Sequence, residues 1–278
     1  MPKISTRPNK PPDWIASKGK LIWKLIARLS NNRIGRLTLQ AATRFTIEST
    51  REVRIGETTF TLCAANPRLD ARVTTFPTRE PQMLKWIDGF ERNSVFWDIG
   101  ANIGLFSLYA AKVKNCRVFA FEPSVFCLEF LARNIWLNDL RDQITIIPNP
   151  LSNKTQENLL TLHSREWGDS SNSFGTSLNQ DGKEIEASFN YKILGSSIDE
   201  SIKNIGLPSP RHIKIDVDGI EPLILAGGSE TLRKIESISV EVPTYQGANQ
   251  QVSKLLNEAG LYLEISDGNQ FWRRKEVE

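Results

Sequence analysis

The sequence predicts an α/β fold in which seven strands form a doubly wound, mostly parallel, Rossmann-like sheet. From residue 95 onward, apolar runs of strand length alternate with segments whose apolar residues recur at helical spacing. The order strand, helix, strand, helix, strand at the start of this region is typical of parallel strands joined by crossover helices. Near the C-terminus, two strand-like runs flank Ser266-Asp267-Gly268-Asn269, which predicts an antiparallel hairpin at one end of the sheet.

The chain divides into a basic, partly helical extension over 1–50, a hairpin and helix over 51–90 that lead into the core, and a main domain over 91–278. Residues 153–195 are rich in Ser, Asn, Asp and Gly, and we expect a polar loop there that forms an insertion or lid. The individual predicted elements are a hairpin at 52–56 and 59–63, a helix at 80–90, strands at 95–98, 117–121, 143–147, 211–216 and 237–242, helices within 105–113, 127–135, 198–205, 221–235 and 252–256, and a hairpin at 261–265 and 270–272.

Local signals support the bounds of these elements. The first hairpin turns at Glu57-Thr58, between two runs that are rich in β-formers. Pro81 suits the first turn of the helix that follows, because proline has no N–H to lose there. Gly260 comes directly after the last helical face, where a left-handed residue commonly ends a helix.

The composition is that of a globular protein. Of the 278 residues, 40% are apolar and 24% are charged, which excludes disordered and collagen-like chains. The mean hydropathy is −0.32, and because no run of about 18 apolar residues occurs we expect no membrane-spanning helix. Three cysteines without paired spacing indicate a reducing compartment, so we expect a cytoplasmic protein. Two histidines far apart in the sequence disfavour a histidine-rich metal site or a Ser-His-Asp triad.

The N-terminal segment is strongly basic. Residues 1–54 contain twelve basic and three acidic residues, a net charge of +9, so the remainder of this +3 chain carries −6. Apolar residues at helical spacing predict a basic amphipathic helix over 13–30. That helix packs on the main domain, makes a peripheral contact with a membrane, or contacts a partner or nucleic acid, and these alternatives stay open. We expect no specific nucleic-acid partner, because no nucleic-acid-binding motif accompanies the charge, and the sequence defines no oligomeric state.

The stretch Asp98-Ile99-Gly100-Ala101-Asn102-Ile103-Gly104 lies where a strand meets a helix. Glycine permits the turn and a close approach of a ligand, and the following helix directs its N-terminal N–H groups toward that ligand. The spacing is neither that of a dinucleotide fingerprint nor that of a P-loop. Glu122 ends the next strand about 20 positions later, where an acidic side chain accepts hydrogen bonds from two ribose hydroxyls. The pair indicates a nucleoside-bearing ligand.

These motifs resemble the FkbM family of class I S-adenosylmethionine-dependent methyltransferases. The resemblance covers roughly residues 80–245 and rests on the motif at 98–104, on Phe121-Glu122-Pro123 and on Lys214-Ile215-Asp216-Val217-Asp218-Gly219-Ile220-Glu221, where Asp218 replaces the usual Glu. It also includes Pro150-Leu151-Ser152-Asn153, on the adenine side. The resemblance implies a methyltransferase sheet, O-methylation, and S-adenosylmethionine as the cofactor. The cofactor contacts that it implies are Asp98, Gly100, Ala101, Asn102, Gly104, Glu122 and Ser152.

Acidic residues gather at the predicted ends of the fourth and fifth strands. Strand alternation places Lys214 and Asp216 on one face, and Glu241 ends the neighbouring strand. Three roles stay open. In the first, Asp216 accepts the proton of the acceptor hydroxyl or orients that hydroxyl. In the second, Lys214 holds Asp216 in its ionised form or is itself the base. In the third, Asp216 and Glu241 ligate a divalent metal. The alternative without catalysis is an ion pair that closes the sheet's end.

The acceptor is expected to be a small molecule or a glycan, because aromatic and hydroxyl residues of the 153–195 insertion suit a polyol. The expected acceptor contacts are Asp218, Glu221, Asn172 and Ser173. Two other functions compete with methyl transfer. An NAD-dependent oxidoreductase would need a third glycine at a fixed interval, which this sequence lacks. A non-catalytic nucleoside-binding module docked by the basic arm would leave the carboxylate cluster unexplained.

Overall fold

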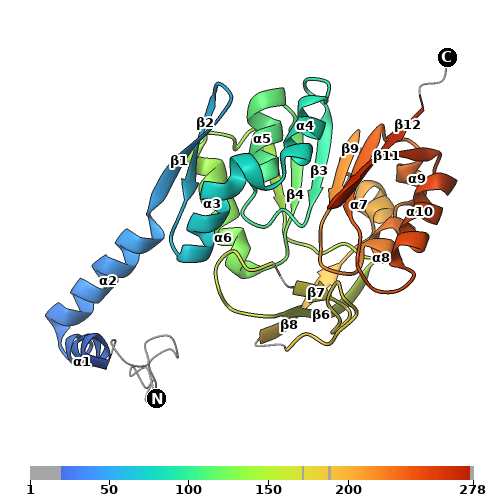
Figure 1. Cartoon of the computed structure of the whole chain (residues 1–278). Helices are drawn as coiled ribbons and strands as arrows, with labels where there is room; N and C mark the ends of the chain where they lie inside the picture. Colours follow the sequence, from blue (N-terminus) through green and yellow to red (C-terminus); the bar gives the residue numbers. More distant parts are fainter. Residues whose placement is uncertain (1–19, 171, 187–188, 276–278) are drawn as a thin grey trace.

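The computed structural model describes residues 20–170, 172–186 and 189–275. A seven-stranded sheet lies at its centre, and β12 is antiparallel to both of its neighbours while the other strands run parallel (Figure 1). In spatial order the strands are β11 (Leu261–Asp267), β12 (Asn269–Arg274), β10 (Ser237–Glu241), β9 (His212–Ile215), β3 (Val95–Ile99), β4 (Arg117–Phe121) and β5 (Ile144–Ile147). The predicted fold class and the C-terminal hairpin are confirmed.

Helices cover both faces of the sheet, as a doubly wound fold requires. One buried apolar cluster joins side chains of α3 to α6 with the sheet, and a second cluster joins those of α7 to α10. The helices of the first group are α3 (Pro67–Arg79), α4 (Pro81–Asp88), α5 (Leu105–Lys114) and α6 (Val125–Leu137), and those of the second are α7 (Ile198–Ile205), α8 (Glu221–Ala226), α9 (Ser229–Leu232) and α10 (Ala248–Glu258).

The central strands are apolar because each is buried on both faces. Strand β9 departs from this rule, since His212 and Lys214 are buried within it. His212 is held deep in the sheet, where its ring stacks on Phe90 at 3.8 Å and its Nδ1 lies 2.8 Å from Ser237 Oγ. Burial lowers the pKa of His212 to about 3, so the ring is neutral at physiological pH. Lys214 lies nearer the carboxyl end of the strand, at the site described below.

The predicted N-terminal hairpin is present as β1 (Thr50–Ile55) and β2 (Thr58–Cys63). It is fixed to α6 by Asn134, whose Oδ1 accepts a hydrogen bond of 2.8 Å from the Cys63 amide. Helix α3 follows it and was not predicted, because its three buried apolar residues are diluted by threonines and by Pro77. The start of α3 is nevertheless encoded, since Asn66 caps it by accepting from the Leu69 amide at 2.7 Å.

The insertion over 153–195 is not the irregular polar loop that its composition suggested. The segment forms a separate three-stranded antiparallel sheet of β6 (Gln156–Leu162), β7 (Asn172–Phe174) and β8 (Phe189–Gly195), with β6 in the middle. Leu160, Leu162 and Phe174 of this small sheet are buried against the second apolar cluster. Their strands pair across long polar connections, so neither spacing nor composition revealed the sheet.

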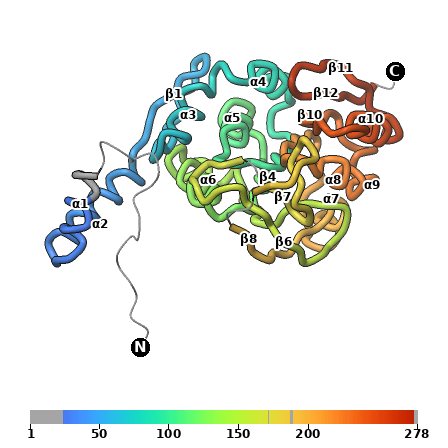
Figure 2. The backbone as a smooth tube through the Cα atoms, turned by 60° about the horizontal axis from the view of Figure 1, so that its bottom comes forward, coloured from blue at the N-terminus to red at the C-terminus, as the bar shows by residue number. Residues whose placement is uncertain are grey.

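The N-terminal extension forms a helical arm of α1 (Lys20–Leu29) and α2 (Arg33–Ile47). The predicted helix over 13–30 is confirmed for residues 20–29, whereas residues 13–19 lie outside the described part. Both views show the arm standing away from the sheet and its helices (Figures 1 and 2). The alternative in which this helix packs on the main domain is therefore not observed for the described part of the arm. No helix among the described residues is long and apolar enough to cross a membrane.

Candidate active site

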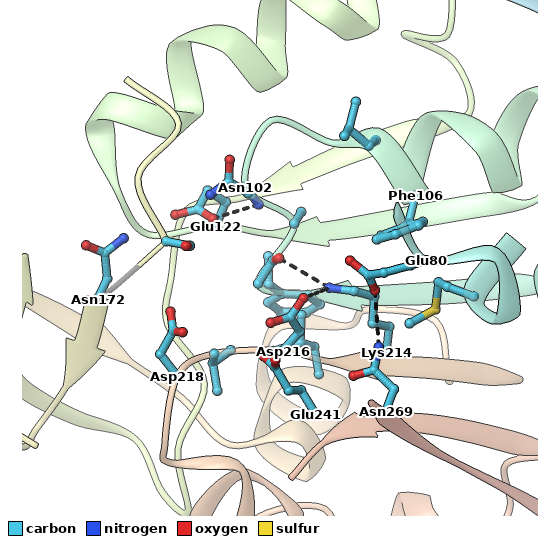
Figure 3. A pocket seen from close by; sticks show the side chains of 18 of the residues that line it. Glu80, Asn102, Phe106, Glu122, Asn172, Lys214, Asp216, Asp218, Glu241 and Asn269 are labelled. Carbon is cyan, nitrogen blue, oxygen red and sulfur yellow. Dashed lines mark hydrogen bonds and ion pairs between the residues drawn. The ribbon is translucent and has the colours of Figure 1, made fainter. Parts of the chain in front are cut away.

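The carboxyl ends of β3, β4, β9 and β10 border a cavity of about 610 Å³ (Figure 3). This is the edge at which open α/β sheets bind ligands. The junction of α3 and α4, the insertion and the β11–β12 turn complete its wall. The predicted residues that line it are Gly100, Ala101, Asn102, Glu122, Asn172, Lys214, Asp216, Asp218 and Glu241.

Gly100 is required where β3 and β9 approach each other most closely. Its φ is +80°, and a Cβ at this position would lie 1.8 Å from the carbonyl oxygen of Asp216. Gly104, with φ +85°, begins α5, and a Cβ there would lie 2.4 Å from the Leu131 side chain. Gly100 therefore allows Asp216 to lie beside this turn, and Gly104 allows the start of α5 to pack against α6.

Glu122 is nearly buried at the end of β4. Its carboxylate accepts hydrogen bonds from the backbone amides of Asn102 at 2.8 Å and Ser124 at 2.7 Å. Burial raises its pKa to about 7, although both amides oppose the shift. Each carboxylate oxygen offers a second lone pair, so the cavity can present it to two hydroxyl donors.

Asn102 is positioned by the insertion. Its Nδ2 donates to the carbonyl oxygen of Asp169 at 3.0 Å, and its buried Oδ1 has no hydrogen-bond partner among the described residues. Asp169 is held in turn by Arg68, at 2.8 Å, and by the Ser164 hydroxyl, at 2.6 Å. These contacts fix the Asn102 side chain, and its backbone amide is bound by Glu122.

Lys214 is a buried cation between two carboxylates. Its Nζ lies 3.0 Å from Asp216 Oδ2 and 3.4 Å from Asp98 Oδ1, and Asp98 also accepts from the Ser107 hydroxyl at 2.6 Å. Burial alone would lower the pKa of Lys214, but the charges of Asp216, Asp98 and Glu80 outweigh it and raise that pKa. Lys214 is therefore protonated at neutral pH.

Asp216 forms a second close pair with Glu241. Burial would raise the pKa of Asp216, but the ammonium of Lys214 outweighs burial and lowers it, so Asp216 is ionised. The pKa of Glu241 is raised by burial and by the charge of Asp216, to which it is hydrogen-bonded. Side by side in the site, Lys214 is therefore a protonated amine, Asp216 a carboxylate and Glu241 a neutral carboxylic acid. The charges of these three side chains cancel, an arrangement that a buried site tolerates.

Asp218 and Asn172 lie together on another side of the cavity, away from Lys214 (Figure 3). The Asn172 backbone donates a hydrogen bond to Asp218. Asp218 has a left-handed backbone, with φ 62°, and its pKa rises to about 8 because it is buried near Asp216 and Glu221. The insertion and the turn after β9 thus meet over the cavity, although they are far apart in sequence.

Some predicted site residues do not line the cavity. Glu221 was expected to contact the acceptor, but it is 1% exposed and its carboxylate accepts from the amides of Val217 and Gly219. It therefore shapes the turn that carries Asp218. The others outside the lining are Asp98, Gly104, Ser152 and Ser173.

Several lining residues were missed by the sequence analysis. Glu80 joins the site from the α3–α4 junction, and its carboxylate accepts from Asn269 Nδ2 at 3.1 Å. Phe106 lies under the Lys214 ammonium, with 5.6 Å between Nζ and the ring centroid. Arg72 and Gln180 also line the cavity. Arg72 and Glu80 come before the motif region and Gln180 from the insertion, so no local pattern links them to the site, whereas Phe106 belongs to the helix that directly follows the motif.

The described residues contain no group of three or more His, Cys, Asp or Glu side chains arranged to hold a metal ion. Asp216 and Glu241 form a pair, and their negative charge is offset by Lys214. A divalent metal at this site would therefore be held by these two carboxylates and would take its other ligands from solvent or substrate.

The sequence profile described as the methyltransferase FkbM domain matches residues 98–264. The chain belongs to the FkbM methyltransferase family. It is an S-adenosylmethionine-dependent methyltransferase, as the resemblance implied, and the oxidoreductase alternative is set aside. The match includes the insertion and ends within β11, so the arm and α3 lie outside it.

Two curated relatives are also methyltransferases. The chain is 27% identical over 271 residues to the hexuronic acid methyltransferase AglP of Haloferax volcanii, a match that covers 92% of this chain and 90% of that protein. It is 28% identical over 196 residues to the methyltransferase sdnD of Sordaria araneosa, covering 60% of this chain and 73% of that protein.

The chain also matches solved structures at low sequence identity. The precorrin-6y C5,15-methyltransferase of Geobacter metallireducens aligns with a TM-score of 0.42 and 15% identity, over 69% of this chain and 84% of that chain. TYW2 of M. jannaschii, solved in complex with AdoMet, aligns with a TM-score of 0.40 and 13% identity, over 82% of this chain and 88% of that chain.

The residues at the motif fit S-adenosylmethionine. Glu122 has free lone pairs for ribose hydroxyls, Asn102 lines the cavity at the turn, and Gly100 presents backbone without a side chain. A cavity of about 610 Å³ is in the range of small-molecule sites. When bound, the cofactor supplies an electrophilic methyl group on a sulfonium.

Proposed function

We propose that this methyltransferase methylates a hydroxyl group of a sugar or of a related polyhydroxylated acceptor. The observation that carries the proposal is the ionised carboxylate of Asp216, which lines the cavity at the end of β9 and lies 3.0 Å from Lys214. A hydroxyl is a weak nucleophile until a base removes its proton, and this carboxylate is positioned to do so. The hexuronic acid named for AglP supports a carbohydrate acceptor.

Asp216 accepts a hydrogen bond from the acceptor hydroxyl and orients its oxygen. S-adenosylmethionine held at the 98–104 turn would supply the methyl group to that oxygen and would leave as S-adenosylhomocysteine. The hydroxyl becomes strongly acidic at that moment, so its proton passes to Asp216 even though the pKa of Asp216 is low.

Lys214 and Glu241 set the state of Asp216. Lys214 is protonated, so it keeps Asp216 ionised and does not itself act as a base. Glu241 is protonated and donates to Asp216, which holds the carboxylate in a fixed orientation. Asn172 and Asp218, at the meeting of the insertion and the β9 turn, supply hydrogen-bonding groups for other acceptor hydroxyls.

The test is transfer of label from methyl-tritiated S-adenosylmethionine to the carbohydrate fraction of an extract of the source cells, with and without EDTA. We expect label in an alkali-stable carbohydrate product, and we expect EDTA to leave the rate unchanged if Asp216 acts on the proton directly. A rate lost with EDTA and restored by Mg²⁺ would instead favour metal ligation by Asp216 and Glu241. Label confined to nucleic acid or protein would contradict the proposed function.

A further inference from the structure

Arg72 is a half-buried cation that lines the cavity without an anionic partner. It belongs to α3, and its Nε donates to the carbonyl oxygen of Gly168 at 2.9 Å. Its two terminal amino groups make no hydrogen bond or ion pair with any described residue, unlike those of the neighbouring Arg68, which bind Glu166 and Asp169. Burial and the nearby charge of Arg79 lower the pKa of Arg72, a cost that a bound anion would remove.

The guanidinium of Arg72 is held in place by the insertion. Gly168 packs on α3 so closely that a Cβ there would lie 2.7 Å from the Leu69 side chain. Asn66 Nδ2 also binds the adjacent Trp167 carbonyl oxygen, at 3.1 Å. A fixed guanidinium with free terminal donors is preorganised for bidentate binding of a carboxylate or phosphate.

The charge of Arg72 acts at the acceptor side of the cavity. Helix α3 presents Arg72, Phe76 and Arg79 to the cavity and is followed by Glu80, which shares the site with Lys214. The charge of Arg72 lowers the pKa values of Asp216 and Asp218, and also that of the buried Cys127. We propose that Arg72 binds an anionic group of the acceptor, so that the substrate is an acidic sugar or a sugar phosphate. This inference rests on the proposed function, which leaves the charge of the acceptor open.

The test measures binding to the enzyme loaded with S-adenosylhomocysteine. The probes are methyl β-D-glucuronide, glucose 6-phosphate and the neutral methyl β-D-glucoside. We expect at least one anion to bind about tenfold or more tightly than the glucoside, and the preference between the two anions identifies the group. Arg72→Gln should abolish this difference, Arg72→Lys should restore part of it, and Arg133→Gln, an equal charge change on the exposed face of α6, should leave it unchanged.

Equal affinity for the glucoside and both anions in the wild type would overturn the assignment. So would a loss of S-adenosylhomocysteine affinity in Arg72→Gln, because Arg72 would then serve the cofactor's own carboxylate. The melting temperature of each variant checks that it is folded. Failure of the proposed function is a separate result, namely an enzyme that discriminates between these probes but transfers no methyl group to carbohydrate.

An independent observation concerns the helical arm. Helix α2 carries an apolar stripe of Ile34, Leu37 and Phe45, which are 78%, 56% and 79% exposed. Their spacing of three and eight residues places them on one helix face. Arg33 and Arg44 lie along one edge of that face, and Arg44 is paired with Glu48, so the helix is amphipathic with its apolar side open to solvent.

The charge of the chain indicates what covers the stripe. The +9 of residues 1–54 opposes the −6 of the remainder, so the arm is drawn to an anionic surface. A second copy of the arm would bring arginines of like charge together. We propose that the α1–α2 arm docks the enzyme on an anionic membrane surface, with the apolar stripe in the headgroup region.

Sedimentation with vesicles tests this proposal with the full chain. We expect binding to phosphatidylglycerol-containing vesicles, weakened at high salt, and little binding to pure phosphatidylcholine. Exchange of both Ile34 and Phe45 for serine should weaken binding about tenfold or more, because the apolar contribution to membrane binding is lost. The matched control is Leu194→Ser on β8, an equally apolar residue that is 55% exposed.

Methyl transfer to a soluble acceptor should be unchanged in the double variant. Absence of vesicle binding, or binding that is indifferent to lipid charge, would overturn the proposal. A dimer that dissociates in the double variant would also overturn it, because the stripe would then be an interface between copies.

Discussion

Asp216→Asn should lower kcat by about 100-fold to 10,000-fold, the usual contribution of a general base. The substitution keeps the shape of the side chain and removes the charge that receives the hydroxyl proton. The affinity for S-adenosylhomocysteine should change little, because its expected contacts are at Gly100, Asn102 and Glu122. Single-turnover rates with saturating cofactor separate the chemical step from binding.

Glu241→Gln is the matched control for Asp216→Asn. Glu241 is already protonated beside Asp216, so an amide donor in its place should cost far less activity. Both variants leave Lys214 paired with Asp98, and melting temperatures report any loss of stability. Full turnover in Asp216→Asn with the natural acceptor would remove this residue from the mechanism.

Glu122→Gln should weaken binding of S-adenosylhomocysteine by about tenfold to 100-fold, the range for hydrogen bonds to a charged group. Glutamine is preferable to alanine here. The two carboxylate oxygens accept from the Asn102 and Ser124 amides, so alanine would leave both N–H groups without an acceptor. Glutamine keeps one of the two acceptors and sets its NH2 group against the other amide, and the melting temperature of the free variant reports that disturbance. Calorimetric titration measures the effect, and NADH serves as the nucleotide control that should not bind.

The affinity for S-adenosylhomocysteine should also depend on pH, in the direction that the raised pKa of Glu122 sets. In the free protein the pKa of Glu122 is raised from 4.5 to about 7, so its contribution to folding stability is lost as the pH rises through that value. Ribose hydroxyls that donate to the ionised carboxylate lower its pKa again, so binding releases a proton. The wild-type affinity should therefore rise between pH 6 and 8 and then level off, about one unit either side of that pKa. An affinity that is independent of pH in the wild type, or equally pH-dependent in Glu122→Gln, would contradict the assignment.

The central sheet was predictable because its signals are local. Most residues of β3 and β4 are apolar, and the glycine turn at 100–104 and Glu122 mark the ends of these two strands. The same is true of Lys214 and Asp216, since strand alternation alone puts both on one face. These parts of the site follow from the topology once the strand order is known.

The remaining wall of the site depends on contacts that spacing does not encode. Arg72 reaches the cavity because α3 packs on Gly168, nearly a hundred residues away. Asn172 reaches it through the pairing of β7 with β6. Glu221 lies in the most specific motif of the chain, but its carboxylate is used by the turn that it follows.

The most direct test of the account is the chemical identity of the methylated atom. Enzyme, S-adenosylmethionine labelled with carbon-13 in the methyl group, and the source-cell extract are incubated together, and the product is identified by proton–carbon correlation. We predict a methyl signal characteristic of an ether on a sugar ring, absent when Asp216→Asn replaces the wild type. A methyl group on nitrogen, sulfur or carbon would contradict the account.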